Sequence, residues 1–157
     1  MSSVQQLVQA LVKTGACTSD GRTLLHIAVD PASSSVADEL YSELPSSAVV
    51  ESLLMAGAVV NAVDSGKNTA LHTAVLNRPE TSRVGVWLEV IHLLLHHGAH
   101  VDMANAKREI ASDMLPRSVN ILNHVSLKCL AAHAIRMHQI SYRGMIPTTL
   151  ADFVDIH

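Results

Sequence analysis

The chain has 157 residues, of which 48% are hydrophobic but only 3% aromatic, and its formal net charge is -3. This length fits one domain, and the scarcity of aromatic side chains favours close-packed short helices over a sandwich or barrel. Because the balance of charge is slightly acidic, the chain has no basic surface for nucleic acid, and nucleic-acid binding is excluded as its main function.

Cys17 and Cys129 are far apart and form no CxxC pair, which is typical of reduced intracellular thiols. The N-terminal residues 1–15 carry two glutamines within their apolar pattern, unlike a secretory leader. No stretch approaches the roughly 20 apolar residues of a membrane span. We therefore expect a cytoplasmic or nuclear protein that makes no membrane contact.

The first predicted element is a helix over residues 4–12, with Gly15 as its stop. Its apolar residues recur at i, i+3, i+4, i+7 and i+8, which is helical spacing. This pattern matches the second helix of each two-helix repeat found later in the chain. We expect the chain to begin within a repeat, as the C-terminal part of a longer architecture, with Val4, Val8 and Leu11 exposed.

Two later segments open with the same first-helix pattern, GRTLLHIAV at 21–29 and GKNTALHTAV at 66–75. Thr69 is the expected N-terminal cap, and Leu71, Ala74 and Val75 form an apolar stripe at i, i+3 and i+4. His26 aligns with His72, and we expect both imidazoles to hydrogen-bond the turns.

Each first helix is followed by a second, at 49–56 and 90–97, and each second helix ends at a glycine, Gly57 or Gly98. Glycine adopts the left-handed conformation at a helix end at little cost. The stripe of the later helix is Val90, Leu93, Leu94 and His97, and Trp87 is expected to pack near its start.

Helix pairs this short bury their apolar faces only against neighbours, so the pattern predicts stacked ankyrin repeats. His26 stands 46 positions before His72, and Gly57 stands 41 before Gly98. Both periods exceed the usual ankyrin length of about 33 residues. The extra residues are expected between the helices of a repeat, at 30–48 and 76–85, with a helical turn within 37–44.

After residue 105, KREIASDML takes the place of a third first helix without the TxLH core, and Pro116 closes this degenerate repeat. Residues 119–137 then predict a long helix that is apolar on two faces. Such a helix in a small protein favours a partner, although the final helix over 147–156 could instead cover the second face.

The predicted fold is therefore an all-α ankyrin solenoid of about three partial or degenerate repeats, residues 1–117, followed by a helical segment, residues 118–157.

The ten histidines raise the possibility of a zinc site, since His92 and His96 lie at i, i+4 with His97 and His100 nearby. However, His26 and His72 fit a structural role at the turns, and His97 precedes the helix-ending Gly98. The sequence also has no GxSxG, HExxH or P-loop motif. We expect no metal, no cofactor and no catalysis, so the chain is interpreted as an interaction module.

Two C-terminal segments carry a more specific resemblance, SLKCLAAHAI at 126–135 and ISYRGMIPTTLADFVDIH at 140–157. They resemble the C-terminal end of the Fem-one (feminisation) family, ankyrin-repeat substrate receptors of cullin-RING ubiquitin ligases. The upstream repeats resemble the last ankyrin repeats of that family in the same order, so the resemblance spans nearly the whole chain.

The resemblance implies two docking elements. The first would bind the elongin B and elongin C heterodimer, with Leu127 in the elongin C pocket and four residues around it, Cys129, Leu130, Ala134 and Ile135. The second would select cullin-two through Ile146, Pro147, Leu150 and Phe153.

In two respects the chain departs from the family pattern. The general elongin box has a cysteine four residues after its leucine, where this chain has Ala131, with Cys129 displaced by two. The N-terminal repeats that form most of the family's substrate pocket are not in this sequence, so a substrate protein would be reached only through such missing upstream repeats. The alternative is a plain ankyrin scaffold whose last helices are only a cap.

Overall fold

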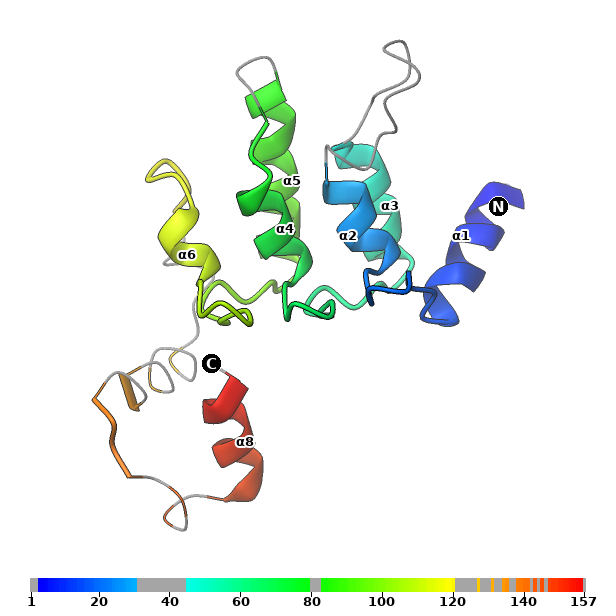
Figure 1. The fold of residues 1–157 in the computed structure, drawn as a ribbon. Helices are drawn as coiled ribbons and strands as arrows, with labels where there is room; N and C mark the ends of the chain where they lie inside the picture. Colours follow the sequence, from blue (N-terminus) through cyan, green and yellow to red (C-terminus); the bar gives the residue numbers. More distant parts are fainter. Residues whose placement is uncertain are drawn as a thin grey trace.

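The computed structural model describes residues 3–30, 45–79, 83–120, 127, 131, 134–135, 138–141, 143, 145 and 147–156. Its helices are α1 (Ser3–Lys13), α2 (Leu24–Val29), α3 (Ser47–Met55), α4 (Ala70–Leu76), α5 (Val84–His96), α6 (Ala111–Met114) and α8 (Thr148–Ile156). Figure 1 shows α1 to α6 standing side by side, with the turns that join one repeat to the next gathered at one end of the row. The predicted helical turn within 37–44 lies outside the described residues.

The helices form an ankyrin solenoid. Within each of two complete repeats the helices pack as a pair, α2 on α3 and α4 on α5, and the pairs then stack, α2 on α4 and α3 on α5. At the two ends of the stack α1 contacts α3 and α6 contacts α4. Within the described ranges the only extended pairings are isolated bridges, so the predicted all-α ankyrin class is confirmed.

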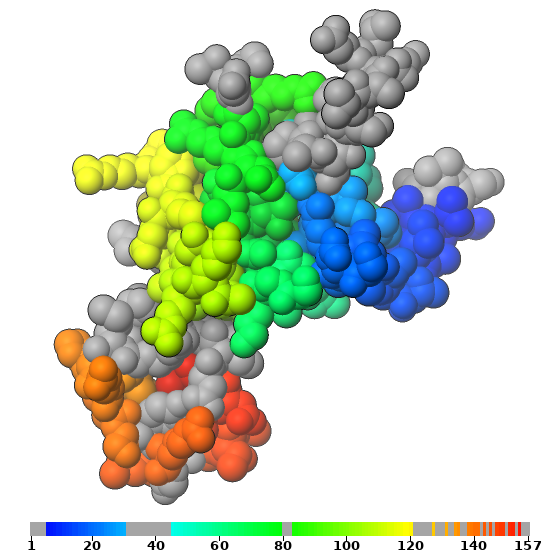
Figure 2. Space-filling model, viewed as in Figure 1, coloured from blue at the N-terminus to red at the C-terminus, as the bar shows by residue number. Residues whose placement is uncertain are grey.

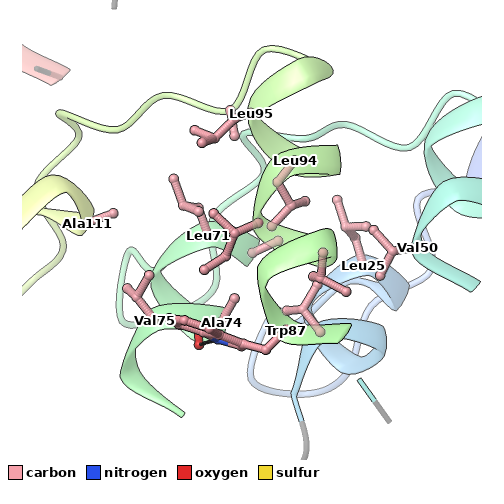
Figure 3. Packing of buried hydrophobic residues seen from close by; sticks show 14 of the residues in the cluster. Leu25, Val50, Leu71, Ala74, Val75, Trp87, Leu94, Leu95 and Ala111 are labelled. Carbon is pink, nitrogen blue, oxygen red and sulfur yellow. Dashed lines mark hydrogen bonds between the residues drawn. The ribbon is translucent and has the colours of Figure 1, made fainter. Parts of the chain in front are cut away.

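One apolar core runs along the stack and draws residues from α2 to α6 (Figure 3). Trp87 is its largest side chain and is 1% exposed. Its indole Nε1 donates to the carbonyl oxygen of Ala74 at 2.7 Å, which satisfies the polar end of a buried tryptophan. The guanidinium of Arg78 lies 5.3 Å from the centre of the indole ring. The predicted packing role of Trp87 is confirmed.

The first helices begin as the TxLH pattern predicts. Thr69 has extended backbone angles, and its hydroxyl accepts the His72 N–H at 3.3 Å. In return the His72 Nδ1 atom accepts the Thr69 N–H at 3.3 Å, which closes a capping box. The same threonine-to-imidazole bond, Thr23 N–H to His26 Nδ1, measures 3.2 Å at the start of α2.

A tight turn, here called a finger, precedes each first helix. In the first finger Gly21 donates to Thr18, in the second Lys67 donates to Asp64, and in the third Arg108 donates to Asn105. Gly21, Lys67 and Arg108 all have positive φ, of 74°, 57° and 64°. The third repeat is therefore degenerate in its helix but retains the finger.

α6 has only four residues, and the reason lies in its sequence. Ile110 replaces the capping threonine, Asp113 replaces the histidine, and the helix ends at Met114, two residues before Pro116. A proline disfavours helical angles at the preceding residue, and Leu115 is extended. The predicted closure of this repeat by Pro116 is confirmed.

The apolar face of α1 is less covered than the apolar faces of the other two second helices. In the register set by Gly15, Gly57 and Gly98, Leu11 is equivalent to Leu53 and Leu94. Leu11 is 38% exposed, whereas the other two leucines are 5% and 0% exposed, because α2 and α4 cover them. Leu11 is exposed as predicted, but the prediction for Val8 was wrong, since Val8 is half-buried against the core.

Several boundaries differ from the predictions. α5 begins at Val84, before Trp87, and is buried over a wider arc that includes Ile91 and Leu95, while Leu93 is only half-buried. The helix predicted from Val119 starts later, because Val119 donates to the Pro116 carbonyl in a turn and its side chain is buried in the core.

In the described part of the chain, no helix is both long enough and apolar enough to cross a bilayer.

Candidate functional site

The C-terminal segment presents an exposed leucine. Residues 127, 131, 134 and 135 are helical, in agreement with the predicted long helix. Leu127 is 85% exposed, and Ala131 and Ala134, which follow at i+4 and i+7, are exposed as well. Residues at this spacing share one helix face. Leu127 is therefore a large apolar side chain beside small neighbours on a solvent-facing surface, while Ile135 is half-buried.

This helix ends in a defined way. The Ile140 N–H donates to the Ile135 carbonyl at 3.0 Å, and Gln139 between them has a φ of 50°. A left-handed residue followed by a bond that returns five positions is the Schellman pattern of a helix C-terminus. The chain leaves this end with Ile140 52% exposed and Met145 79% exposed. In Figure 2 the described residues beyond 127 lie below the finger end of the stack.

α8 follows an exposed Pro147. The sequence predicted Pro147 as the first helical residue, but α8 begins at Thr148. The proline lies one position earlier, where its carbonyl accepts the Ala151 N–H at 3.0 Å. Its missing N–H costs nothing there, since the first amides of a helix have no intrahelical partner. One side of α8 is covered, because Val154 is 4% exposed.

The other predicted docking residues fall largely outside the described part of the molecule. Cys129, Leu130 and Ile146 are not among the described residues. Leu150 and Phe153 lie within α8, and their side chains are likewise outside it. The structure therefore places Leu127 and Ala134 on one helix face, and the docking roles of both predicted sets stay predictions.

Two groups of histidines can be distinguished within the ankyrin stack. His26 and His72 are 1% and 0% exposed, and their Nε2 atoms lie 2.8 Å and 3.2 Å from the carbonyl oxygens of Asn68 and Glu109 in the next finger. Burial lowers the pKa of both imidazoles, against the opposing effect of these carbonyls. The predicted structural role at the turns is confirmed.

The second group lies near the end of α5. His92 and His96 are exposed, the rings of His96 and His97 meet edge to face, and His100 Nδ1 lies 3.9 Å from Asp102. In the described ranges no three histidine, cysteine or carboxylate side chains converge closely enough to hold a metal ion. The zinc alternative thus receives no geometric support, and metal-free folding stays a prediction.

A groove of about 620 Å³ lies between the outer helices α3 and α5. It is lined by Ser47 and Glu51 from α3 and by four residues of α5, Glu89, His92, Leu93 and His96. His92 and His96 were considered in the sequence analysis, but the carboxylates Glu51 and Glu89 were not. The spacing of Glu89, His92 and His96 at i, i+3 and i+7 marks one face of α5 and could have revealed them.

Comparisons with known proteins agree with this fold. The ankyrin-repeat family model matches residues 66–106, which include α4 and α5. Protein fem-1 homolog C of Danio rerio is 34% identical over 159 residues, covering 98% of this chain and 24% of that protein. The human fem-1 homolog C is 37% identical over 139 residues, and the human fem-1 homolog A is 33% identical over 158.

The chain is homologous to a stretch of the fem-1 proteins. It spans about a quarter of the length of these curated relatives. Because the fem-1 homology with the Danio rerio protein covers 98% of the chain, it takes in the C-terminal segment as well as the ankyrin stack. The family resemblance predicted from the sequence is thereby confirmed.

Proposed function

We propose that this chain is a non-catalytic adaptor of a cullin-RING ubiquitin ligase, acting in the cytoplasm or nucleus. Its C-terminal helix would dock on elongin B and elongin C through Leu127, and the turn at Pro147 would contact cullin-two. The observation that supports this proposal best is the exposure of Leu127, at 85%, on a helix of a fem-1 homologue.

An exposed leucine followed by small residues on the same helix face has the form of an interface anchor. Ala131 and Ala134 leave the Leu127 side chain protruding, so a partner pocket could enclose it without displacing neighbours. Fully burying a leucine contributes about 1.5–3 kcal/mol, and most interfaces depend on a few such residues. Leu127 therefore suits the elongin C pocket that the resemblance assigns to it.

A pull-down with purified elongin B and elongin C tests this role. Leu127→Asp should abolish retention, because a carboxylate buried without a partner costs several kcal/mol. Since the side chain is exposed in the free chain, the substitution should leave folding intact. Met55→Asp, at a residue 75% exposed on α3, is the matched control and should bind normally. Undiminished binding by Leu127→Asp would exclude the elongin role.

The choice of cullin rests on the entry to α8. Pro147, Thr148 and Thr149 are exposed, whereas Val154 is buried, so the start of the helix is the part free for contact. The sequence IPTTL resembles the IPxxL pattern of cullin-two receptors rather than the LPLP of cullin-five receptors. We expect assembly only after elongin binding, because neither surface alone offers the area of a stable interface.

Size-exclusion chromatography with elongins and each cullin's N-terminal domain tests this choice. We expect co-elution with cullin-two and its loss in the Ile146→Ala, Pro147→Ala double variant. Preference for cullin-five, or unchanged binding by the double variant, would refute the assignment.

The second candidate function is a plain ankyrin scaffold, which the burial of Val154 favours, since a covered α8 suits a cap. Such a scaffold would bind proteins through its repeats and show no retention on elongins. The pull-down with the unaltered chain therefore separates the two candidates. Only the ligase-adaptor proposal includes recruitment of a substrate protein, which would occur through ankyrin repeats upstream of the stretch that this chain shares with the fem-1 proteins.

A further inference from the structure

An apolar cavity of about 280 Å³ lies at the α1 end of the stack. Its walls come from α1, from the start of α2 and from the turn that follows α3. Most of the side chains in these walls are apolar, and the largest belong to Leu11, Val12, Leu24, Leu25 and Val59. Val59 is 71% exposed and Leu11 is 38% exposed, so large apolar side chains are in contact with water here.

The same position is filled one repeat later. In the register of the helix-ending glycines and the TxLH motifs, the walls of the cavity correspond to Leu53, Leu54, Thr69, Ala70, Leu71 and Ala99. The exposed fractions of these six residues are 5%, 7%, 0%, 1%, 0% and 3%. They are covered because α2 lies there, packed on both α3 and α4. The cavity is therefore the place where a first helix fits against α1 and α2.

A backbone acceptor beside the cavity also lacks the partner that its equivalent has. The Asn68 carbonyl accepts the Asp64 N–H at 3.0 Å and lies 2.8 Å from the Nε2 atom of His26. Arg22 is the equivalent residue of the first finger, next to Thr23 in the cavity wall. Its carbonyl accepts the Thr18 N–H at 2.9 Å, and within the described residues no imidazole bonds to it. One acceptor position of this carbonyl is therefore open, since a carbonyl oxygen has two lone pairs.

The first finger offers a backbone donor in addition. The Ser65 N–H donates to the Asp20 carbonyl, and the Ala106 N–H donates to the Gly66 carbonyl, so each finger bonds to the one before it. Ser19 is the equivalent residue of the first finger, and its N–H makes no such bond in the described part of the chain. The apolar cavity, the acceptor and the donor are thus arranged as they are where a finger and a first helix attach one repeat later.

From this arrangement we infer that the cavity binds a helix of the TxLH type from a partner protein, together with the finger that precedes it. The leucine of that helix would fill the cavity, and its imidazole Nε2–H would donate to the Arg22 carbonyl. The inference goes beyond elongin and cullin docking, since neither Leu127 nor Pro147 lines the cavity.

The identity of the partner follows from how this chain uses its own motifs. The sequence has two TxLH motifs, at 23–26 and 69–72. Their leucines, Leu25 and Leu71, are 1% and 0% exposed, so both helices are committed to the stack of their own chain. A second copy of the chain therefore has no such helix to donate, and the helix comes from a different protein.

A synthetic peptide with capped ends and the sequence of residues 64–77 is the probe, because it contains a finger and a TxLH helix. A helix this short is mostly unfolded in water, so the cost of ordering it opposes binding. We expect a dissociation constant of roughly millimolar, which amide NMR of the labelled full chain detects and locates. The signals of Val12, Ala16, Ser19 and Val59 should shift.

Two altered peptides separate the apolar contact from the hydrogen bond. Leu71→Asp in the peptide should abolish the shifts, because a carboxylate would enter an apolar cavity. Methylation of the peptide's histidine at Nε2 removes the donor to Arg22, while Nδ1 can still accept the threonine N–H within the peptide. The methylated peptide should bind about three- to tenfold more weakly, the usual effect of one hydrogen bond. Equal binding of the aspartate peptide would overturn the inference, and equal binding of the methylated peptide would overturn the role of the histidine.

Variants of the chain locate the site. Val59→Asp, at a residue 71% exposed, should keep the fold and its retention on elongins but lose the peptide. Leu127→Asp makes the same change at a residue 85% exposed outside the cavity, so it should bind the peptide as the unaltered chain does. Undiminished peptide binding by Val59→Asp, or an equal loss in both variants, would contradict the site. Self-association of the unaltered chain that Val59→Asp removes would overturn the assignment to a different protein.

Discussion

The Nε2 atom of His26 lies 2.8 Å from the carbonyl oxygen of Asn68, so the first helix of one repeat is bonded to the finger of the next. His72 repeats the arrangement toward Glu109 at 3.2 Å. At its other nitrogen each ring accepts a backbone N–H, from Thr23 or Thr69. A neutral imidazole with its hydrogen on Nε2 satisfies both partners, whereas a protonated ring would direct an N–H at an N–H.

Acid should therefore destabilise the stack. Burial lowers the pKa of His26 and His72 from the ordinary value of 6.5, so the folded protein holds both rings neutral. An imidazole with a lowered folded pKa contributes its full stability above the unfolded value and loses it as the pH falls through the folded value. We expect the thermal midpoint to be constant from neutral pH down to about pH 6.5 and to fall below it.

Single substitutions separate this effect from general acid sensitivity. His72→Gln should lose about 1–3 kcal/mol at neutral pH, because it leaves the threonine amide and the Glu109 carbonyl poorly paired, and should show a shallower acid slope. His92→Gln, at an exposed position, should change neither quantity. An acid slope that is the same in both variants would contradict the assignment.

Trp87 should be more important for stability than any exposed residue of α5. Trp87→Phe removes the bond to the Ala74 carbonyl, leaving a buried acceptor unpaired, at a cost of about 1–3 kcal/mol. Trp87→Ala adds a cavity and should cost about 3–5 kcal/mol. Val86→Ala on the same helix, where the side chain is 38% exposed, should cost far less. Urea denaturation measures all three free energies of unfolding.

Two glycines should respond to alanine in opposite directions. Gly98 has a φ of 86° with open space around it, so Gly98→Ala should destabilise by about 1–2 kcal/mol through backbone strain alone. Gly85 lies near the start of α5, also in open space and with no positive φ, so Gly85→Ala should stabilise by up to about 1 kcal/mol. Equal signs for the two changes in free energy would show that one backbone description is wrong.

The last expectation concerns metal and redox chemistry. Cys17 is free and exposed, and His92, His96 and His100 do not form a converging set in the described ranges. We expect neither a chelator nor a reducing agent to move the thermal midpoint. A drop of several degrees on adding chelator, restored by zinc, would show that these histidines bind metal.

The repeats could be predicted from the sequence because their signals are local. Thr69 and His72 are three residues apart, and their capping box needs nothing from outside one helical turn. Gly98 likewise ends α5 through its own backbone. Such patterns recur in successive repeats, so the interpretation of one repeat supports the interpretation of the next.

The remaining features depend on distant residues. The late start of the helix predicted from Val119 follows from a turn on Pro116 and from burial in the ankyrin core. The groove takes its lining from two helices, with Glu51 on α3 and Glu89 on α5, a relation that no single helix encodes. The left-handed angles of Lys67 and Arg108 were not predicted either, because the fold imposes there a conformation that glycine usually supplies.

The fingers are joined to one another by backbone atoms, with the Ser65 N–H donating to the Asp20 carbonyl and the Ala106 N–H donating to the Gly66 carbonyl, each at 2.9 Å. These bonds require no particular side chain at the tips. Mutation can therefore exchange the exposed charges of Asp20, Lys67 and Lys107 over evolutionary time while the spacing between repeats is inherited unchanged. Related proteins could thus acquire new binding preferences at the fingers without having to evolve a new scaffold.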